Sequence, residues 1–216
     1  MENTSITSLN KVVRGPKRAT YDKQTAYDII DSHMICHMSY VYDGYPITIP
    51  TGYGRKGDKL YLHGSLKNRM LLGALEAGKV SVTITHLDGL VLARSVFHHS
   101  VNYRSAVIFG QASLVEDPVE KMEALEIITE NFIKGRWEEA RQPNEKEFKA
   151  TLVIAVSIDQ YSAKVRAEGV NDEVADLDLD VWAGVVPMST HYGAPQPESD
   201  LRPGISLPAS VKSIVP

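Results

Sequence analysis

The chain has 216 residues, of which 43% are hydrophobic and 23% are charged, and its formal net charge at pH 7 is −4. This length and composition predict a globular protein with one sizeable core or two small ones. The mild acidity gives no electrostatic case for binding nucleic acid or an acidic membrane. Cys36 is the single cysteine, so no internal disulfide is expected, and a reducing, cytoplasmic location follows. No apolar stretch reaches the roughly 18 residues that a membrane-spanning helix needs, and the first residues lack a signal-peptide pattern.

The chain is expected to divide into three parts. Residues 1–19 form a polar arm with a basic cluster, which is typical of a solvated tail or of a segment that lies over a neighbouring subunit. Residues 20–192 hold the folded domain, and residues 193–216 form a tail, rich in proline and glycine, for which no structure is predicted. The basic cluster of the arm consists of Lys11, Arg14, Lys17 and Arg18.

The first half of the domain predicts one helix and three strands. Apolar residues at helical spacing after Thr20 indicate a short helix. The segment 35–42 is rich in β-forming residues, and Asp43-Gly44 after it is a hairpin signal. The expected strands are 35–42, 45–53 and 59–63.

Two helices and four strands are expected in the second half. Residues 66–77 carry apolar residues at helical spacing and precede Gly78, a residue that favours a helix C-terminus. Residues 118–133 have the most regular helical pattern in the chain. Six or seven strands joined mainly by short turns predict an α+β antiparallel barrel rather than a doubly wound sheet. The expected strands are 79–85, 89–97, 103–115 and 151–161.

A candidate phosphate site lies at residues 63–69, His-Gly-Ser-Leu-Lys-Asn-Arg, where a strand ends and a helix begins. Main-chain N–H groups at a helix N-terminus favour an anion, and Ser65, Lys67 and Arg69 add donors and positive charge. In the alternative, Ser65 only caps the helix while the two cations face water. The pattern leaves both interpretations open.

A second polar segment, residues 97–105, contains the adjacent histidines His98 and His99. Adjacent residues on a strand point to opposite faces, so these two do not readily share a metal ion. No cysteine or third histidine stands at a ligand-like spacing, and no metal site is expected. A hydrogen-bonding role at the barrel rim fits the segment better. The residues for that role are Ser100, Asn102, Arg104 and Ser105.

Trp182 stands near the end of the chain and is followed by a short apolar stretch. A tryptophan in this setting packs over the core as a lid or stacks against a planar ligand, and the sequence leaves both open. The acidic run 168–180 before it is expected to be a solvated loop rather than a pair of catalytic carboxylates.

Three motifs, taken in order, give the chain a family resemblance. They are Tyr61-Leu62-His63-Gly64-Ser65-x-x-Asn68-Arg69-Met70, the segment 97–110 that begins Phe-His-His-Ser-Val-Asn-Tyr-Arg-Ser, and the segment 182–187, Trp-Ala-Gly-Val-Val-Pro. In these motifs the chain resembles the pyridoxamine 5'-phosphate oxidase-like split-barrel family. More narrowly, it is similar to the flavin-nucleotide-binding branch that includes the 5-nitroimidazole resistance reductases. The resemblance covers residues 21–188.

The resemblance implies a six-stranded antiparallel split β-barrel with flanking helices, which forms a homodimer with two FMN sites in the interface. The strand 47–51 would lie along the isoalloxazine ring, residues 63–65 would approach the ribityl chain and phosphate, and residues 67–69 would bind the phosphate. Trp182 of the partner subunit would wall the pocket. The implied cofactor-binding residues are Ile47, Thr48, Ile49, Pro50, Thr51, His63, Gly64, Ser65, Lys67, Asn68, Arg69, Arg104, Ser105 and Trp182.

The resemblance also implies an FMN-dependent oxidoreductase that passes electrons from a nicotinamide nucleotide to a small acceptor. It does not imply a typical pyridoxamine phosphate oxidase, because the strand 47–51 has no arginine or lysine and Arg202 lies in the tail. His63 and His99 are the candidate catalytic groups, since histidine titrates near neutral pH. Two alternatives stay open: a non-enzymatic flavin-binding protein, and a haem-binding or haem-degrading split barrel with His98 or His99 as the axial ligand.

Overall fold

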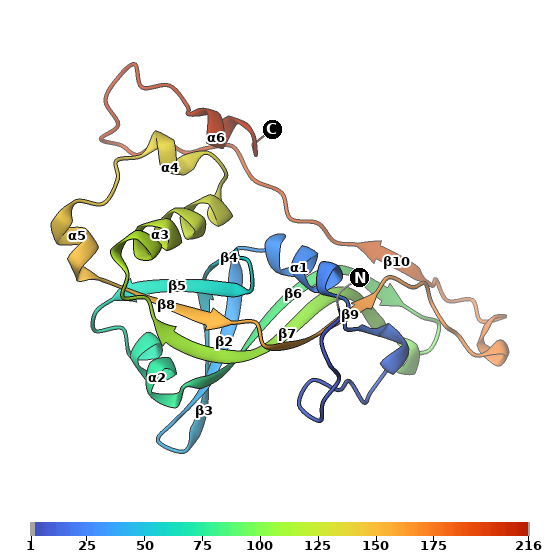
Figure 1. The fold of residues 1–216 in the computed structure, drawn as a ribbon. Coiled ribbons are helices and arrows are strands. Elements are labelled where there is room, and N and C mark those ends of the chain that lie inside the picture. The colour runs from blue at the N-terminus through green and yellow to red at the C-terminus, as the bar shows by residue number, and fades with distance from the viewer. Residues whose placement is uncertain (1–2, 216) are drawn as a thin grey trace.

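A strongly bent antiparallel sheet forms the centre of the molecule, and helices pack against it (Figure 1). The computed structural model describes residues 3–215. Its strands are β1 (Ala19–Thr20), β2 (Ile35–Tyr42), β3 (Tyr45–Gly52), β4 (Gly54–Lys56), β5 (Lys59–Ser65), β6 (Lys79–Leu92), β7 (Ser100–Leu114), β8 (Thr151–Ser157), β9 (Gln160–Arg166) and β10 (Gly184–Pro187). Its helices are α1 (Lys23–Asp31), α2 (Arg69–Ala77), α3 (Pro118–Phe132), α4 (Arg136–Glu139), α5 (Glu145–Ala150) and α6 (Ala209–Lys212), with the 3-10 turns η1 (Pro16–Arg18), η2 (Val96–His98) and η3 (Val174–Asp176).

The strand order explains why the barrel is split. The main path runs β3-β2-β6-β7-β8-β5-β4, while β9 pairs with β7, β1 with β9 and β10 with β6. The two ends of the path, β3 and β4, follow one another in the chain, so the sheet curls back on itself without a hydrogen-bonded seam that closes it. The predicted α+β antiparallel split barrel with flanking helices is therefore confirmed.

The number of strands differs from the six expected, because some predicted strands divide and others merge. The single strand expected at 151–161 is two strands, since β8 pairs with β5 and β7 while β9 turns away to pair with β7 and β1. The strands expected at 79–85 and 89–97 are one long strand, β6, which absorbs a register shift between Leu87 and Gly89 and ends at Leu92. Tertiary pairing, which local pattern does not record, decides both outcomes.

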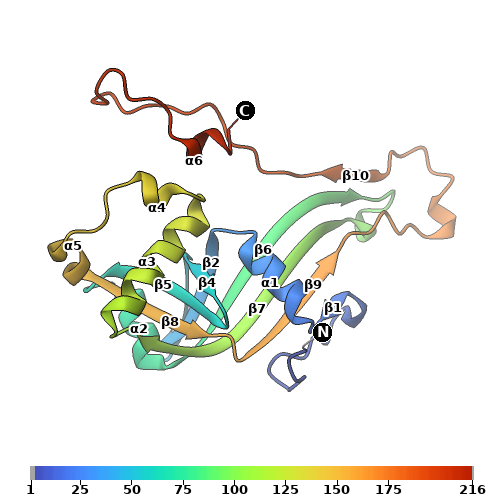
Figure 2. The same ribbon diagram turned by 45° about the horizontal axis from the view of Figure 1, so that its top comes forward.

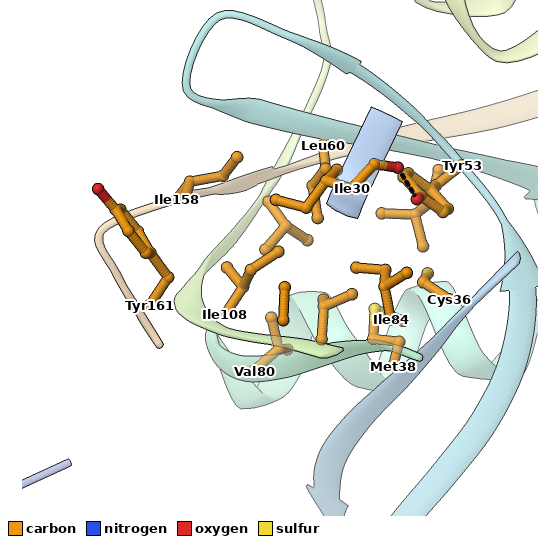
Figure 3. Close-up of a cluster of buried hydrophobic side chains, with 14 of the residues drawn as sticks. Ile30, Cys36, Met38, Tyr53, Leu60, Val80, Ile84, Ile108, Ile158 and Tyr161 are labelled. Atoms are coloured by element: carbon orange, nitrogen blue, oxygen red, sulfur yellow. Dashed lines mark hydrogen bonds between the residues drawn. The ribbon is translucent and has the colours of Figure 1, made fainter. Parts of the chain in front are cut away.

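The main core fills the inside of the barrel (Figure 3). Alternate residues of β2 point inward, namely Cys36, Met38 and Tyr40, as the period of two requires. The phenol of Tyr53 is also fully buried, and its hydroxyl donates a hydrogen bond to the main-chain oxygen of Ile30 at the end of α1. Burial raises the pKa of the Cys36 thiol to about 12, which leaves this cysteine an inert core residue.

A second, smaller core lies on the outer side of β5 and β8, where α3 covers it. The predicted helix 118–133 is confirmed as α3, which begins with Pro118 and is capped by the side chain of Asp117. Its buried residues are Ala124 and Ile128, which pack on Tyr61 of β5. The helix α3 packs closely on β4 because residue 54 is a glycine. A side-chain carbon at Gly54 would lie only 2.7 Å from Ile127 of α3.

Both terminal segments are attached to the domain (Figures 1 and 2). In the N-terminal arm, Thr7 donates to Gln160 at 2.7 Å and the buried Asn10 donates to the main chain of Tyr161 at 3.1 Å, so the arm lies along β9. The C-terminal tail, expected to lack structure, ends in the short helix α6, where Ser210 N donates to Glu139 of α4 at 3.0 Å. Within the part of the chain described, no helix is long and apolar enough to cross a membrane.

Candidate functional site

The strand β3 lies at an edge of the sheet, because it pairs along its length with β2 and with no other described strand. The side chains of Ile47 and Ile49 pack against the barrel core, while Thr48 and Pro50 point outward. The Thr48 hydroxyl lies 2.8 Å from that of Ser39 on β2. A ligand along β3 would therefore meet outward side chains and unpaired main-chain groups of the edge, and not the isoleucine side chains.

The segment 63–69 folds differently from the expectation at one point. Ser65 does not cap the helix; the Asn68 side chain does, accepting from Met70 N at 3.0 Å and Leu71 N at 3.2 Å. The helix begins at residue 69 rather than 66, and Leu66 N instead donates to Ala150 O of the neighbouring segment at 3.3 Å. Asn68 is thus committed, through its oxygen, to the end of α2.

Positive charge gathers where α2 begins. Lys67 and Arg69 are exposed, and neither forms an ion pair with any residue that the structure describes. The guanidinium carbon of Arg69 lies 4.8 Å from the ring centre of Tyr42, at the hairpin that joins β2 to β3. The structure therefore brings the predicted phosphate segment and the predicted ring-facing strand to the same side of the barrel.

His63 lies on β5, one strand from the edge formed by β4, opposite Val153 of β8. Its side chain keeps an exposed face, yet desolvation by the surrounding atoms lowers its pKa below the usual value. The ring is thus neutral at pH 7 and able to both donate and accept a hydrogen bond.

Arg104 and Ser105 lie on β7, separated from β3 by β2 and β6. The Arg104 guanidinium is engaged by Asp88 of β6, to which it donates two hydrogen bonds at 3.0 and 2.9 Å. Ser105 stands between Thr85 and Lys164 on the neighbouring strands. Within one chain, these two residues are not part of the cluster around α2.

The two adjacent histidines lie between the predicted strands and not on one, so the argument that a strand points them to opposite faces does not apply. His98 ends the turn η2 and His99 follows it. The His99 Nδ1 accepts a hydrogen bond from Ala93 N at 3.1 Å, and His98 Nε2 lies 3.5 Å from a carboxylate oxygen of Glu173. Among residues 3–215, no group of three or more histidine, cysteine or acidic side chains is placed to hold a metal ion.

Trp182 is 65% exposed, so it does not plug the core of its own chain. Its ring lies against Gly184, where a side chain would approach it to 2.9 Å. The following strand β10 pairs with the end of β6, and Figures 1 and 2 place it at the opposite end of the sheet from α2. The structure does not bring Trp182 to the other candidate residues of the same chain.

The acidic run 168–180 is mostly exposed, as expected, but two arginines fix its first residues. Arg94 donates to Asp172 at 2.6 Å, and the Asp172 side chain is only 2% exposed. Burial opposes the ionised form of Asp172, yet the hydrogen bonds from Arg94 outweigh it and its pKa is lowered. The buried Arg166 donates to the main-chain oxygens of Glu168 and Gly169 at 3.2 and 3.1 Å. No local pattern pairs Arg94 with Asp172, because they are far apart in the sequence.

A cavity of about 540 Å³, which the sequence analysis missed, opens on the outer face of the sheet. Its residues come from the N-terminal arm and from β2, β3, β6, β7 and β9. The strand pattern held a partial indication of this cavity. Ser39, Ser81 and Phe109 occupy outward positions of their strands and share one row across the sheet. The lining residues are Leu9, Ser39, Tyr40, Val41, Pro46, Lys79, Val80, Ser81, Phe109, Gly110, Gln111, Asp159 and Gln160.

The open antiparallel barrel assigns the fold to the split-barrel class. Residues 22–165 match the pyridoxamine 5'-phosphate oxidase family, and the chain therefore belongs to that family. No curated protein matches the sequence.

Among solved structures, the flavocytochrome Anf3 from Azotobacter vinelandii is 33% identical, with a TM-score of 0.90 over 96% of this chain and 97% of its own. The FAD and heme binding protein from Mycobacterium smegmatis is 36% identical, with a TM-score of 0.87 over 92% of this chain and 97% of its own. A candidate 5-nitroimidazole antibiotic resistance protein from Bacteroides thetaiotaomicron is 26% identical, with a TM-score of 0.59 over 68% of this chain and 86% of its own.

Proposed function

We propose that this protein binds a flavin nucleotide beside β3 and the start of α2. The observation that carries the proposal is the pair of exposed cations, Lys67 and Arg69, which form no ion pair among the described residues. Arg69 contacts Tyr42 at the hairpin that leads into the edge strand β3. A phosphate placed there gains charge-assisted hydrogen bonds. The unpaired main-chain groups of β3 suit the polar edge of a planar ring. The names of the two full-length relatives support a flavin.

The flavin is FMN or FAD, and the residues proposed here act on the part that both share. Lys67 and Arg69 bind the phosphate next to the ribityl chain, which both cofactors carry. The motif resemblance favours FMN, whereas the mycobacterial relative is named for FAD. Extraction of the cofactor from the purified protein, followed by chromatography against both standards, decides between them.

We propose further that the holoprotein is an oxidoreductase that accepts electrons from a nicotinamide nucleotide. When bound, the flavin supplies hydride and electron transfer. The chain holds the ring along β3, and neutral His63 offers a hydrogen bond nearby. Since the chain has one cysteine and needs no disulfide, the cytoplasm is the proposed compartment.

The site is proposed to lie in the interface of a homodimer. Trp182 and Arg104 are distant from the α2 cluster within one chain, and their motif positions would meet a flavin only across two subunits. The fully formed site would then combine β3 and α2 of one copy with Trp182 of the partner subunit.

The function is tested by mixing purified protein with NADH or NADPH without oxygen and following the absorbance of the flavin. We expect two broad flavin bands, which bleach on addition of one of the two donors. A protein that binds flavin but does not bleach with either donor is a flavin-binding protein without this activity. A protein with no affinity for FMN, FAD or riboflavin contradicts the whole proposal.

Haem binding is a second candidate function, favoured by the names of both full-length relatives. The adjacent histidines His98 and His99 differ as possible iron ligands. A neutral imidazole has one acceptor nitrogen, and that of His99 already accepts from Ala93 N. His98 is therefore the residue of this pair that would hold the iron. A sharp Soret band that is lost in His98→Ala and kept in His99→Ala is the expected result.

A further inference from the structure

Two oppositely charged segments lie near the two ends of β9. The basic arm, residues 6–18, lies back along β9, held at Gln160 and Tyr161. The acidic arm, residues 168–182, begins beyond the other end of β9 and projects past the ends of β6 and β7 (Figure 2). An ion pair of 2.7 Å between Arg18 and Glu168 joins the two arms at their roots.

Away from that root, the outer charges of both arms are unpaired among the residues that the structure describes. No ion pair is found, among the residues that the structure describes, for the outer cations of the basic arm or for the outer carboxylates of the acidic arm. The two sets have the same size. The cations are Lys11, Arg14 and Lys17, and the carboxylates are Asp176, Asp178 and Asp180.

Both arms also expose large apolar side chains between their charges. In the basic arm Val13 is 80% exposed, and in the acidic arm Val174 is 83% exposed. Beside the acidic arm, the turn η2 presents Val96 and Phe97, of which 85% and 86% are exposed. Apolar side chains exposed together to this extent mark an interaction surface rather than an ordinary solvated face.

The acidic arm has a fixed shape. Arg94 binds Asp172, and Arg166 binds the main chain at Glu168 and Gly169. An arm that is already ordered loses little conformational entropy when it binds, which favours association. Its apolar side chains nevertheless find no cover within their own chain.

We propose that the acidic arm and η2 of one copy dock on the basic arm of a second copy, and that the reverse contact forms at the same time. This inference rests on the dimer proposed above. The outer charges of the two arms are opposite in sign, and the apolar residues of the arms supply a surface to bury. In a two-fold dimer each contact is repeated with the roles of the two copies exchanged, so a self-complementary interface of this kind closes as a dimer.

The test uses charge reversal in full-length protein. The first variant carries Lys11→Glu, Arg14→Glu and Lys17→Glu, and the second carries Asp176→Lys, Asp178→Lys and Asp180→Lys. Sedimentation equilibrium at low ionic strength measures the dimer dissociation constant of each, and circular dichroism confirms the fold. We expect each variant to raise the constant about tenfold or more, and the combination of all six changes to restore it.

The control variant carries Lys134→Glu, Lys146→Glu and Lys212→Glu, which change the net charge as the first variant does but lie outside both arms. It is expected to keep the wild-type constant. Equal weakening by the control, or failure of the six-fold variant to restore the dimer, overturns the proposal.

A flavin spectrum of each sample separates this inference from the proposed function. If wild-type protein binds flavin but is monomeric at every concentration, the arms do not dock and the flavin proposal stands. If the dimer responds as expected while no flavin is bound, the arms are established and the flavin proposal is wrong.

Discussion

The side chain of Arg104 on β7 reaches across to Asp88 on β6 and donates two hydrogen bonds to its carboxylate. The main-chain oxygen of Asp88 accepts a further hydrogen bond from Met188 N at 2.9 Å, just after β10. One residue therefore ties together β6, β7 and the start of the C-terminal tail. Hydrogen bonding to Arg104 lowers the pKa of Asp88 and hydrogen bonding to Asp88 raises that of Arg104.

We expect the ion pair between Arg104 and Asp88 to stabilise the folded protein by an amount that depends on pH. Because the folded pKa of Asp88 lies below its unfolded value of about 3.9, the unfolded chain binds more protons in acid. The stabilisation is present above about pH 4 and is lost as the pH falls through the folded pKa. Asp88→Asn is expected to lower the melting temperature at pH 7, and the gap to wild type should close in acid. A gap that is independent of pH contradicts this assignment.

Removal of the two cations at the start of α2 is expected to weaken binding of the cofactor through its phosphate. Lys67→Ala with Arg69→Ala should weaken FMN binding by about 1.5–3 kcal/mol per lost charge-assisted bond, and leave riboflavin binding almost unchanged because riboflavin carries no phosphate. Isothermal titration of both ligands measures the difference. Lys134→Ala serves as the control for loss of an exposed lysine, and equal losses for both ligands would show that no phosphate binds here.

Trp182→Ala separates a stability role from a binding role. Loss of a buried tryptophan costs about 3–5 kcal/mol, but Trp182 is mostly exposed, so the melting temperature of the apoprotein should change little. If Trp182 walls a flavin site across the dimer, the flavin dissociation constant should rise clearly. The two measurements on this one variant decide the matter, and unchanged affinity rejects the interface role.

Gly110, the one glycine of β7, is expected to tolerate no side chain. A side-chain carbon there would lie 1.7 Å from the main-chain oxygen of Ser157, so the backbone of β7 or β8 would have to move. Gly110→Ala should destabilise the protein by about 3 kcal/mol or more. At Gly169 nothing lies within 4 Å, and Gly169→Ala should be close to neutral in the same denaturant titration.

Local signals sufficed for several elements of the fold. The hairpin predicted at Asp43-Gly44 forms, with positive φ of 50° and 74° as a tight two-residue turn requires. The helix α3 appears where its apolar period places it, and Gly78 ends α2 in a conformation with φ of 67°. These features depend on residues within a few positions of one another, and that is the range over which sequence pattern carries information.

The remaining features depend on distant partners. Ser65 and Asn68 both suit a helix start, and the folded chain uses Asn68, while Leu66 N is bonded to the distant Ala150. Likewise, nothing near Asp172 in the sequence shows that Arg94 buries it. The cavity on the outer sheet face joins six separate segments, so its existence could not be read from any one of them.

The attachment of α6 to α4 has a consequence for the integrity of the chain. The segment 188–208 is fixed at one end by β10 on β6 and at the other by Ser210 on Glu139, whereas its own residues are almost all exposed. Exposed backbone of this kind is where proteases cut. A single cut there would leave the terminal peptide docked, so the nicked protein would keep its full mass in solution and separate into two pieces only under denaturing conditions.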